Sequence, residues 1–217
     1  MAVRDDKEQM RELRRQGLSL REIAATVGRS ESTVRNAVKD IAMPIGFYRK
    51  ELKAALVQGS IVNLETTGSD SDRDDIVAFG FLQGNIINVV QRVDSTPHEF
   101  HAVVADRLSS LSHPLYAYDA RFQEGFLLAK LHQPVQLVDI FDTWREQARK
   151  RGARLPNLDD LASVPRQYFG ETQVLDRELG SLWLAYVKTG DKRKISAIVR
   201  HCMEDLRQAL YVMMFAD

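Results

Sequence analysis

Two pairs of residues far apart in this sequence have side chains whose types and spacing are suited to chemistry. Glu65 follows Asn63 by two positions, and an extended strand directs residues at this spacing to the same face. Asp205 follows His201 by four positions, so a helix would place both on one face. A histidine titrates near neutral pH and is therefore suited to activating water. The alternative interpretation of His201 is a helix-surface histidine held by the neighbouring carboxylate.

A third pair, Asp119 and Gln123, shares the four-residue spacing and hence one helical face. Asp119 also stands where a helix is expected to begin, and aspartate is among the favoured residues at a helix N-cap. From the residues alone, the N-cap interpretation outweighs a ligand role for Asp119. Cys202, beside His201, is interpreted as a small buried hydrophobic residue rather than a nucleophile.

The elements that must position these residues form an α/β pattern from residue 60 onward. Short β-branched runs predict strands, and two of them flank Gly84 as a hairpin would. The expected strands are 61–65, 76–83, 85–92, 115–118 and 135–138, and the expected helices are 97–111, 120–131 and the chain beyond 138. This order predicts an α/β, RNase H-like mixed sheet flanked by helices.

The first forty residues predict a separate, small all-α domain. Gly28 separates two short amphipathic segments, and Ser30 is placed to cap the second one. Two short helices joined by a tight turn, with a third helix in front, make a helix-turn-helix. The stretch GLSLREIAATVGRSESTVRNAV, residues 17–38, resembles the DNA-binding modules of resolvases and transcription regulators. The side chains expected to contact a DNA groove are those of Arg29, Ser32, Thr33, Arg35, Asn36 and Lys39.

The boundaries follow from these patterns. We expect a helix-turn-helix domain at 1–42, a linker and a leading helix at 43–59, and the RNase H-like domain at 60–217. The leading helix is predicted because apolar residues between 47 and 56 return at helical spacing after Pro44 and Gly46. Residues 1–44 carry nine basic and seven acidic groups, a weak charge for binding phosphates. A helical bundle for dimerisation or protein contacts is therefore the alternative for the first domain.

Three stretches resemble, in order, the motifs of the DEDD 3′–5′ exonuclease superfamily, in its DnaQ-like and YprB-like branches. They are IVNLETTG at 61–68, LYAYDARFQEGFL at 115–127 and TGDKRKISAIVRHCMEDLRQAL at 189–210. The resemblance implies hydrolysis of a phosphodiester with two Mg²⁺ or Mn²⁺ ions held by four carboxylates. It also implies a general base one helical turn from the last carboxylate.

Carried over residue by residue, this family pattern is only partly kept. Glu65 and Asp205 match two of the four carboxylates, whereas Asn63 and Gln123 stand where the family has aspartate. Asp119 stands at a family asparagine and would be a displaced ligand. The resemblance thus implies a catalytic set of Asn63, Glu65, Asp119, His201 and Asp205, with Glu65, Asp119 and Asp205 on the metal and His201 as the base.

An amide is neutral and a poor metal ligand, so we expect two divalent ions to bind weakly or not at all and nuclease activity to be impaired. Three explanations of the altered residues stay open. They are an engineered change at Asn63, decay of the domain to a binding-only one, and a rearranged site. The rearranged set would be Glu65, Asp119, Glu124 and Asp205.

Composition limits the classes of protein to which the chain belongs. Thirty basic and thirty acidic residues cancel, and 44% hydrophobic residues suffice for a core. No apolar run reaches the ~20 residues that span a bilayer, so no membrane partner is expected. The charged N-terminus lacks the apolar stretch of a secretory signal, and one cysteine cannot form an internal disulfide. We therefore expect a cytoplasmic protein.

Two basic runs, 145–154 and 188–194, suit a groove that follows a nucleic-acid backbone, although charge runs are often only solvated faces. The aromatic residues expected to stack on bases beside them are Trp144, Tyr168, Phe169 and Trp183. The sequence thus predicts a nucleic-acid-binding protein, for DNA rather than RNA, with an exonuclease-type domain. The alternatives are a DNA-binding regulator or architectural protein with an inactive nuclease fold, and a scaffold that touches no nucleic acid. The oligomeric state is left open.

Overall fold

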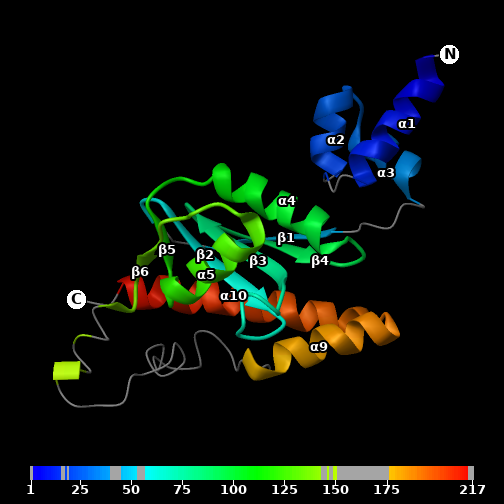
Figure 1. Ribbon diagram of the computed structural model, residues 1–217. Helices are drawn as coiled ribbons and strands as arrows, with labels where there is room; N and C mark the ends of the chain where they lie inside the picture. Colours follow the sequence, from blue (N-terminus) through cyan, green and yellow to red (C-terminus); the bar gives the residue numbers. More distant parts are fainter. Residues whose placement is uncertain are drawn as a thin grey trace.

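The computed structural model describes residues 2–15, 18, 20–39, 45–52, 57–142, 146, 149–150 and 176–214. A bundle of three N-terminal helices stands at one end of a larger α/β domain (Figure 1). The described helices include none that is long and apolar enough to cross a membrane.

The N-terminal bundle consists of α1 (Ala2–Arg15), α2 (Leu20–Val27) and α3 (Glu31–Val38). Its small core contains Ile23 from α2 and Val34 from α3, both fully buried. The Ser30 side chain caps α3 by accepting a hydrogen bond from the Thr33 backbone N–H at 3.2 Å. Gly28 has a φ of +64°, the left-handed conformation that lets the chain turn between α2 and α3. The predicted helix-turn-helix geometry is confirmed.

The α/β domain is built on a six-stranded sheet in the order β1-β4-β3-β2-β5-β6. The pairs β1–β4, β4–β3 and β3–β2 are antiparallel, whereas β2–β5 and β5–β6 are parallel. The strands are β1 (Ile45–Glu51), β2 (Ser60–Thr66), β3 (Ile76–Gln83), β4 (Ile86–Arg92), β5 (Leu115–Ala117) and β6 (Val138–Asp139). The mixed sheet expected from the sequence is confirmed, with one strand more.

That additional strand, β1, corrects the helix expected within 43–59. Residues 45–51 are extended and pair with β4, from Ile45 opposite Arg92 to Glu51 opposite Ile86. The hairpin formed by β3 and β4 leaves one edge of β4 free to hydrogen-bond, and pairing with that edge overrides a local helical pattern. Residues 40–44 and 53–56 lie outside the described part of the chain.

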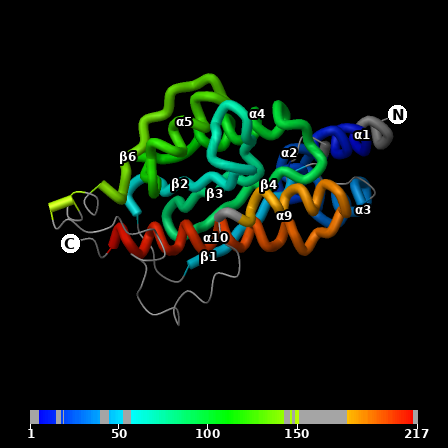
Figure 2. The backbone as a smooth tube through the Cα atoms, turned by 60° about the horizontal axis from the view of Figure 1, so that its bottom comes forward, coloured from blue at the N-terminus to red at the C-terminus, as the bar shows by residue number. Residues whose placement is uncertain are grey.

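The helices cover the two faces of the sheet separately (Figures 1 and 2). On one face lie α4 (Pro97–Ser109) and α5 (Ala120–Leu131), packed around a core that includes Phe79 and Phe100. On the other face lie α9 (Asp176–Thr189) and α10 (Lys192–Met214), which run side by side and bury Leu206 against the sheet. Side chains of β2 alternate between these faces, so Asn63 and Glu65 share the α10 face.

Helix α10 crosses the sheet at Gly80 of β3, the residue paired with Asn63. A Cβ at Gly80 would overlap Cys202 Sγ and would lie 2.8 Å from Leu206 Cδ1. The absence of a side chain therefore permits the close approach of α10 to the strands. This approach brings the polar residues of α10 within reach of those on β2.

Candidate functional site

The site is assembled from one strand and one helix. Strand β2 contributes Asn63 and Glu65, and α10 contributes His201 and Asp205 from successive turns. Glu65 and His201 are only 2% and 4% exposed, so both lie beneath the surface. Asp205 retains 20% of its side-chain exposure and forms the part of the group that is open to solvent.

Two nitrogen groups bridge the two carboxylates. The Asn63 amide donates to Glu65 Oε1 at 2.9 Å and to Asp205 Oδ2 at 3.4 Å. His201 Nδ1 lies 3.3 Å from Glu65 Oε1 and 3.3 Å from Asp205 Oδ2. The predicted sharing of faces by the two pairs is thus observed. Asn63 stands between the carboxylates as a hydrogen-bond donor.

The donor set of this group fits one divalent cation. One atom each from Glu65, His201 and Asp205 lies within 4.8 Å of the other two. Among the described residues, no other acidic residue joins this group. Two ions about 4 Å apart need more negative ligands than two carboxylates, because each ion carries two positive charges. The side chains present therefore do not fit a pair of ions.

Asp119 is placed differently from the other candidates. It occupies the N-cap position of α5 with a left-handed backbone, φ 50° and ψ 60°, and makes no side-chain capping bond. Asp139 of β6 takes that role, because its Oδ2 accepts a hydrogen bond from the Ala120 backbone N–H at 3.2 Å. The structure does not bring Asp119 into the group of Glu65, His201 and Asp205.

Gln123, at the position of a family aspartate, is 3% exposed. Its Nε2 donates to the Tyr118 carbonyl at 2.9 Å, and its Oε1 is buried with no hydrogen-bond partner within the described residues. The next residue, Glu124, accepts a hydrogen bond from the Leu137 backbone N–H at 2.8 Å. Glu124 thus holds the segment before β6, a structural role that does not support its place in a rearranged metal site.

Cys202 lies directly under this group and is fully buried. Burial raises the pKa of its thiol well above the usual value, and the negative charges of Glu65 and Asp205 raise it further. A thiol held in its neutral form is a poor nucleophile. The interpretation of Cys202 as a small buried residue is confirmed.

The groove-facing residues predicted in the first domain lie around α3. Ser32, Thr33, Arg35, Asn36 and Lys39 are all exposed on its outer side. Arg29 is exposed as well, but its guanidinium forms an ion pair with Asp6 of α1, including a hydrogen bond from Nε at 3.2 Å. Arg29 thus ties α1 to the start of α3. Arg35 and Lys39 are the other two cations of the exposed surface, with Arg35 in its middle and Lys39 at its C-terminal end.

One predicted stacking residue is corrected. Trp183 is only 6% exposed, packs in the core under α10, and has the Arg92 guanidinium 5.3 Å above its ring. A buried ring cannot receive a base. The other three aromatic residues and most of the 145–154 run lie outside the described residues. The run at 188–194 forms the turn from α9 to α10, with Lys192 and Arg193 exposed.

Comparison with known families agrees with this architecture. A family model of the RNase H superfamily matches residues 60–216. The chain belongs to the RNase H superfamily. A helix-turn-helix domain model also matches residues 5–39. No curated protein matches the chain. The RNase H-like domain and the helix-turn-helix domain together connect the chain with nucleic-acid binding.

Proposed function

We propose that this protein binds DNA through both domains and that its RNase H-like domain holds a strand without cleaving it. The helix-turn-helix supports the choice of DNA over RNA, because a helix fits the major groove of B-form DNA but not the narrow one of A-form RNA. The exposed row on α3, from Ser32 to Lys39, offers polar and basic side chains for that groove.

The single observation that carries the proposal is the position of Asn63. Its amide donates to both Glu65 and Asp205, the two carboxylates that remain in the site. In the DEDD exonucleases that this sequence resembles, an aspartate at this position touches both metal ions. Here a neutral donor satisfies the carboxylates, and the site lacks the negative charge that would hold two cations.

A single divalent cation fits the remaining residues, with Glu65, His201 and Asp205 as its ligands. Such an ion would supply positive charge for a phosphate oxygen of a bound strand. An imidazole with two carboxylates favours Mn²⁺ or Zn²⁺ over Mg²⁺. In this arrangement His201 is a ligand, which replaces the role of general base expected from the resemblance.

The second candidate function is a slow 3′–5′ exonuclease of the DEDD type. The gathering of Glu65, His201 and Asp205 within 4.8 Å favours it, because one metal can still polarise a phosphate. The two candidates differ in one measurable property. The exonuclease shortens a bound strand at a rate that a chelator abolishes, whereas the binding protein leaves the strand intact with or without metal.

Binding and cleavage can be followed in one experiment on the full chain. A labelled duplex is titrated at several salt concentrations, and the strand lengths are then read on a gel with Mn²⁺ or a chelator present. We expect intact strands and an affinity that falls with salt. Replacing both Arg35 and Lys39 with alanine should reduce the slope of log K against log salt by about 1.8, because each phosphate contact contributes about 0.9.

The matched control is Lys130→Ala, which removes a cation from α5, away from α3. Its slope should equal that of the unaltered chain. An unchanged slope in the Arg35 and Lys39 variant would overturn the assignment of α3. Absence of any binding to duplex or single strand at low salt would overturn the proposed function as a whole.

A further inference from the structure

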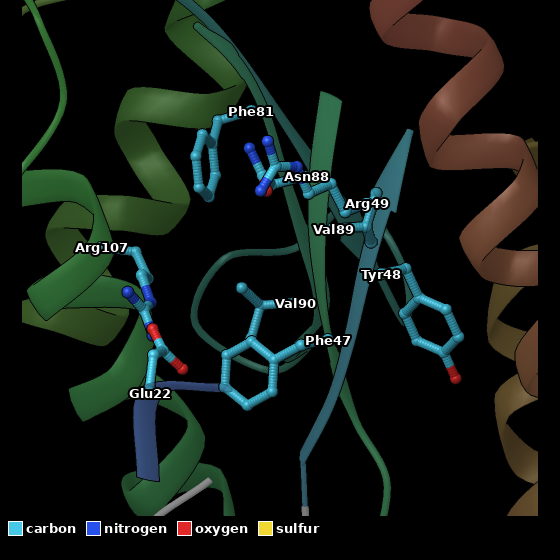
Figure 3. Close-up of a pocket in the computed structure, with 9 residues that line it drawn as sticks. All are labelled: Glu22, Phe47, Tyr48, Arg49, Phe81, Asn88, Val89, Val90 and Arg107. Carbon is cyan, nitrogen blue, oxygen red and sulfur yellow. The ribbon is translucent and has the colours of Figure 1, made fainter. Parts of the chain in front are cut away.

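A pocket of about 260 Å³ lies on the face of the sheet opposite Glu65 (Figure 3). Strands β1, β3 and β4 form its floor, α4 lies along one side, and α2 of the helix-turn-helix closes one end. The side chains that matter here are those of Phe47, Arg49, Phe81, Asn88, Arg107 and Glu22. Tyr48, the residue between Phe47 and Arg49, points to the other side of β1 in Figure 3.

The floor of the pocket combines three kinds of chemistry in one row. Arg49 of β1 pairs with Asn88 of β4, which in turn pairs with Phe81 of β3, so the three side chains lie across adjacent strands on one face. An aromatic face stacks on a nucleobase, a guanidinium binds phosphate, and an amide forms hydrogen bonds with a base edge. Within the described residues, neither Arg49 nor Asn88 makes a side-chain hydrogen bond or ion pair, and Arg49 is exposed.

The two ends of the pocket differ in charge. At the α2 end, the Arg107 guanidinium lies 5.5 Å from the centre of the Phe47 ring and 3.6 Å from the Glu22 carboxylate. The negative charge of Glu22 disfavours phosphate at this end. At the other end Arg49 is the only charged residue lining the described pocket. A ligand with one phosphate and one flat apolar part would therefore direct its phosphate to Arg49 and its flat part onto Phe81.

We propose that this pocket binds an unpaired nucleotide of a DNA strand that leaves the duplex held by the helix-turn-helix. The pocket is smaller than the roughly 300–1,000 Å³ typical of sites for drug-sized ligands, which suits a single base and excludes a base pair. Helix α2 forms one wall and packs against α3 in the same small core. The pocket therefore adjoins the domain that we propose holds the duplex.

The inference rests on the proposed function and specifies its target: a duplex with an adjoining single-stranded segment. It makes the reverse face of the sheet a second nucleic-acid contact, separate from the group at Glu65. The two cationic side chains of β1 provide a matched pair for a test. Arg49 lies in the pocket, whereas Lys50, equally exposed, projects from the opposite face of the same strand.

The test compares a blunt DNA hairpin with the same hairpin carrying a short single-stranded extension at either end. The extension contains 2-aminopurine, whose fluorescence falls when it stacks. Fluorescence anisotropy with the full chain should show that one of the two extended hairpins binds about tenfold more tightly than the blunt one. This ratio lies within the roughly 5- to 150-fold gain in affinity expected for one stacked base. Arg49→Gln and Phe81→Leu should each remove most of this advantage, and Phe81→Leu should also restore the 2-aminopurine fluorescence.

Lys50→Gln should keep both the advantage and the fluorescence change. Affinity for the blunt hairpin should be the same in all variants, which also shows that each one is folded. Equal binding of blunt and extended hairpins by the unaltered chain would overturn this inference and leave the proposed function standing. If Arg49→Gln still binds the extended hairpin more tightly than the blunt one by the same factor, this inference is likewise overturned and the proposed function stands. Failure to bind either hairpin would overturn both.

Discussion

At the scale of single residues, the chemistry of the site depends on how Asn63 differs from a carboxylate. An amide donates hydrogen bonds where an aspartate would accept them, so Glu65 and Asp205 gain a partner that is not a cation. The His201 ring lies between the same two oxygens. The carboxylates are thus satisfied by the chain's own nitrogen atoms, and a second metal ion has no ligands left.

The residue spacing made much of this group predictable. Two residues apart on a strand and four apart on a helix give shared faces in any fold, so Asn63, Glu65, His201 and Asp205 could be foreseen together. The position of Asp119 could not be foreseen. It depends on the left-handed backbone at the start of α5 and on Asp139 of β6, whose side chain caps α5 in place of Asp119.

Asp75 provides a prediction about pH at the residue scale. Burial alone would raise the pKa of Asp75, but its hydrogen bond with His101 and the charges of His101 and Arg92 outweigh burial and lower that pKa. A carboxyl group whose pKa is lower in the folded state stabilises the protein above its unfolded pKa of about 3.9 and loses this effect as the pH falls toward the folded pKa.

Asp75→Asn should therefore lower the free energy of unfolding by about 2 kcal/mol at pH 7. This value is typical of a hydrogen bond to a charged group. Urea unfolding of the variant and the unaltered chain should give midpoints that converge as the pH is lowered below 4. A difference in midpoint that stays constant from pH 7 to pH 3 would contradict the role assigned to the charge of Asp75.

At the scale of elements, the approach of α10 to the sheet decides whether the site exists. The helical period of 192–214 is visible in the sequence, but the depth at which α10 packs depends on Gly80, a residue of another element.

Strand β1 shows more plainly that a local sequence pattern does not reveal contacts with other elements. Its apolar spacing resembles that of a helix, and only pairing with the free edge of β4 makes it a strand. The sequence alone therefore does not show that Phe47 and Arg49 lie near Phe81. The two-residue spacing of Ile45, Phe47 and Arg49 is the feature of the sequence that indicates a strand with these side chains on one face.

Gly80→Ala tests this packing. The added methyl group would overlap Cys202 and Leu206 of α10, and such overpacking costs about 1–3 kcal/mol. Gly125→Ala is the control, because a Cβ there meets no atom within 4 Å and lies inside α5, where alanine stabilises a helix by about 0.5–1 kcal/mol. Denaturant unfolding should shift in opposite directions for the two variants. Equal midpoints would show that α10 does not require the glycine.

At the scale of the whole molecule, we propose three contacts for nucleic acid, distributed over the two domains. The exposed row on α3 fits duplex DNA, the pocket between α2 and the sheet fits an unpaired nucleotide, and the group at Glu65 fits a strand and one cation. The division into a helix-turn-helix and an RNase H-like domain was predictable, since each has its own apolar periodicity. The contact between them, through Glu22 and Arg107, was not, because these two residues are more than eighty positions apart in the sequence.

We propose above all that, because of Asn63, this member of the RNase H superfamily binds nucleic-acid strands without cleaving them. The most direct test of this proposal is single-turnover cleavage of a bound, labelled strand in Mn²⁺ by the unaltered chain and by Asn63→Asp. We predict no chelator-sensitive cleavage above background for the unaltered chain and a rise of about 10²–10³-fold for the variant, the range that one transition-state contact contributes. Rapid, chelator-sensitive cleavage by the unaltered chain would contradict the claim, because Glu65, His201 and Asp205 would then suffice.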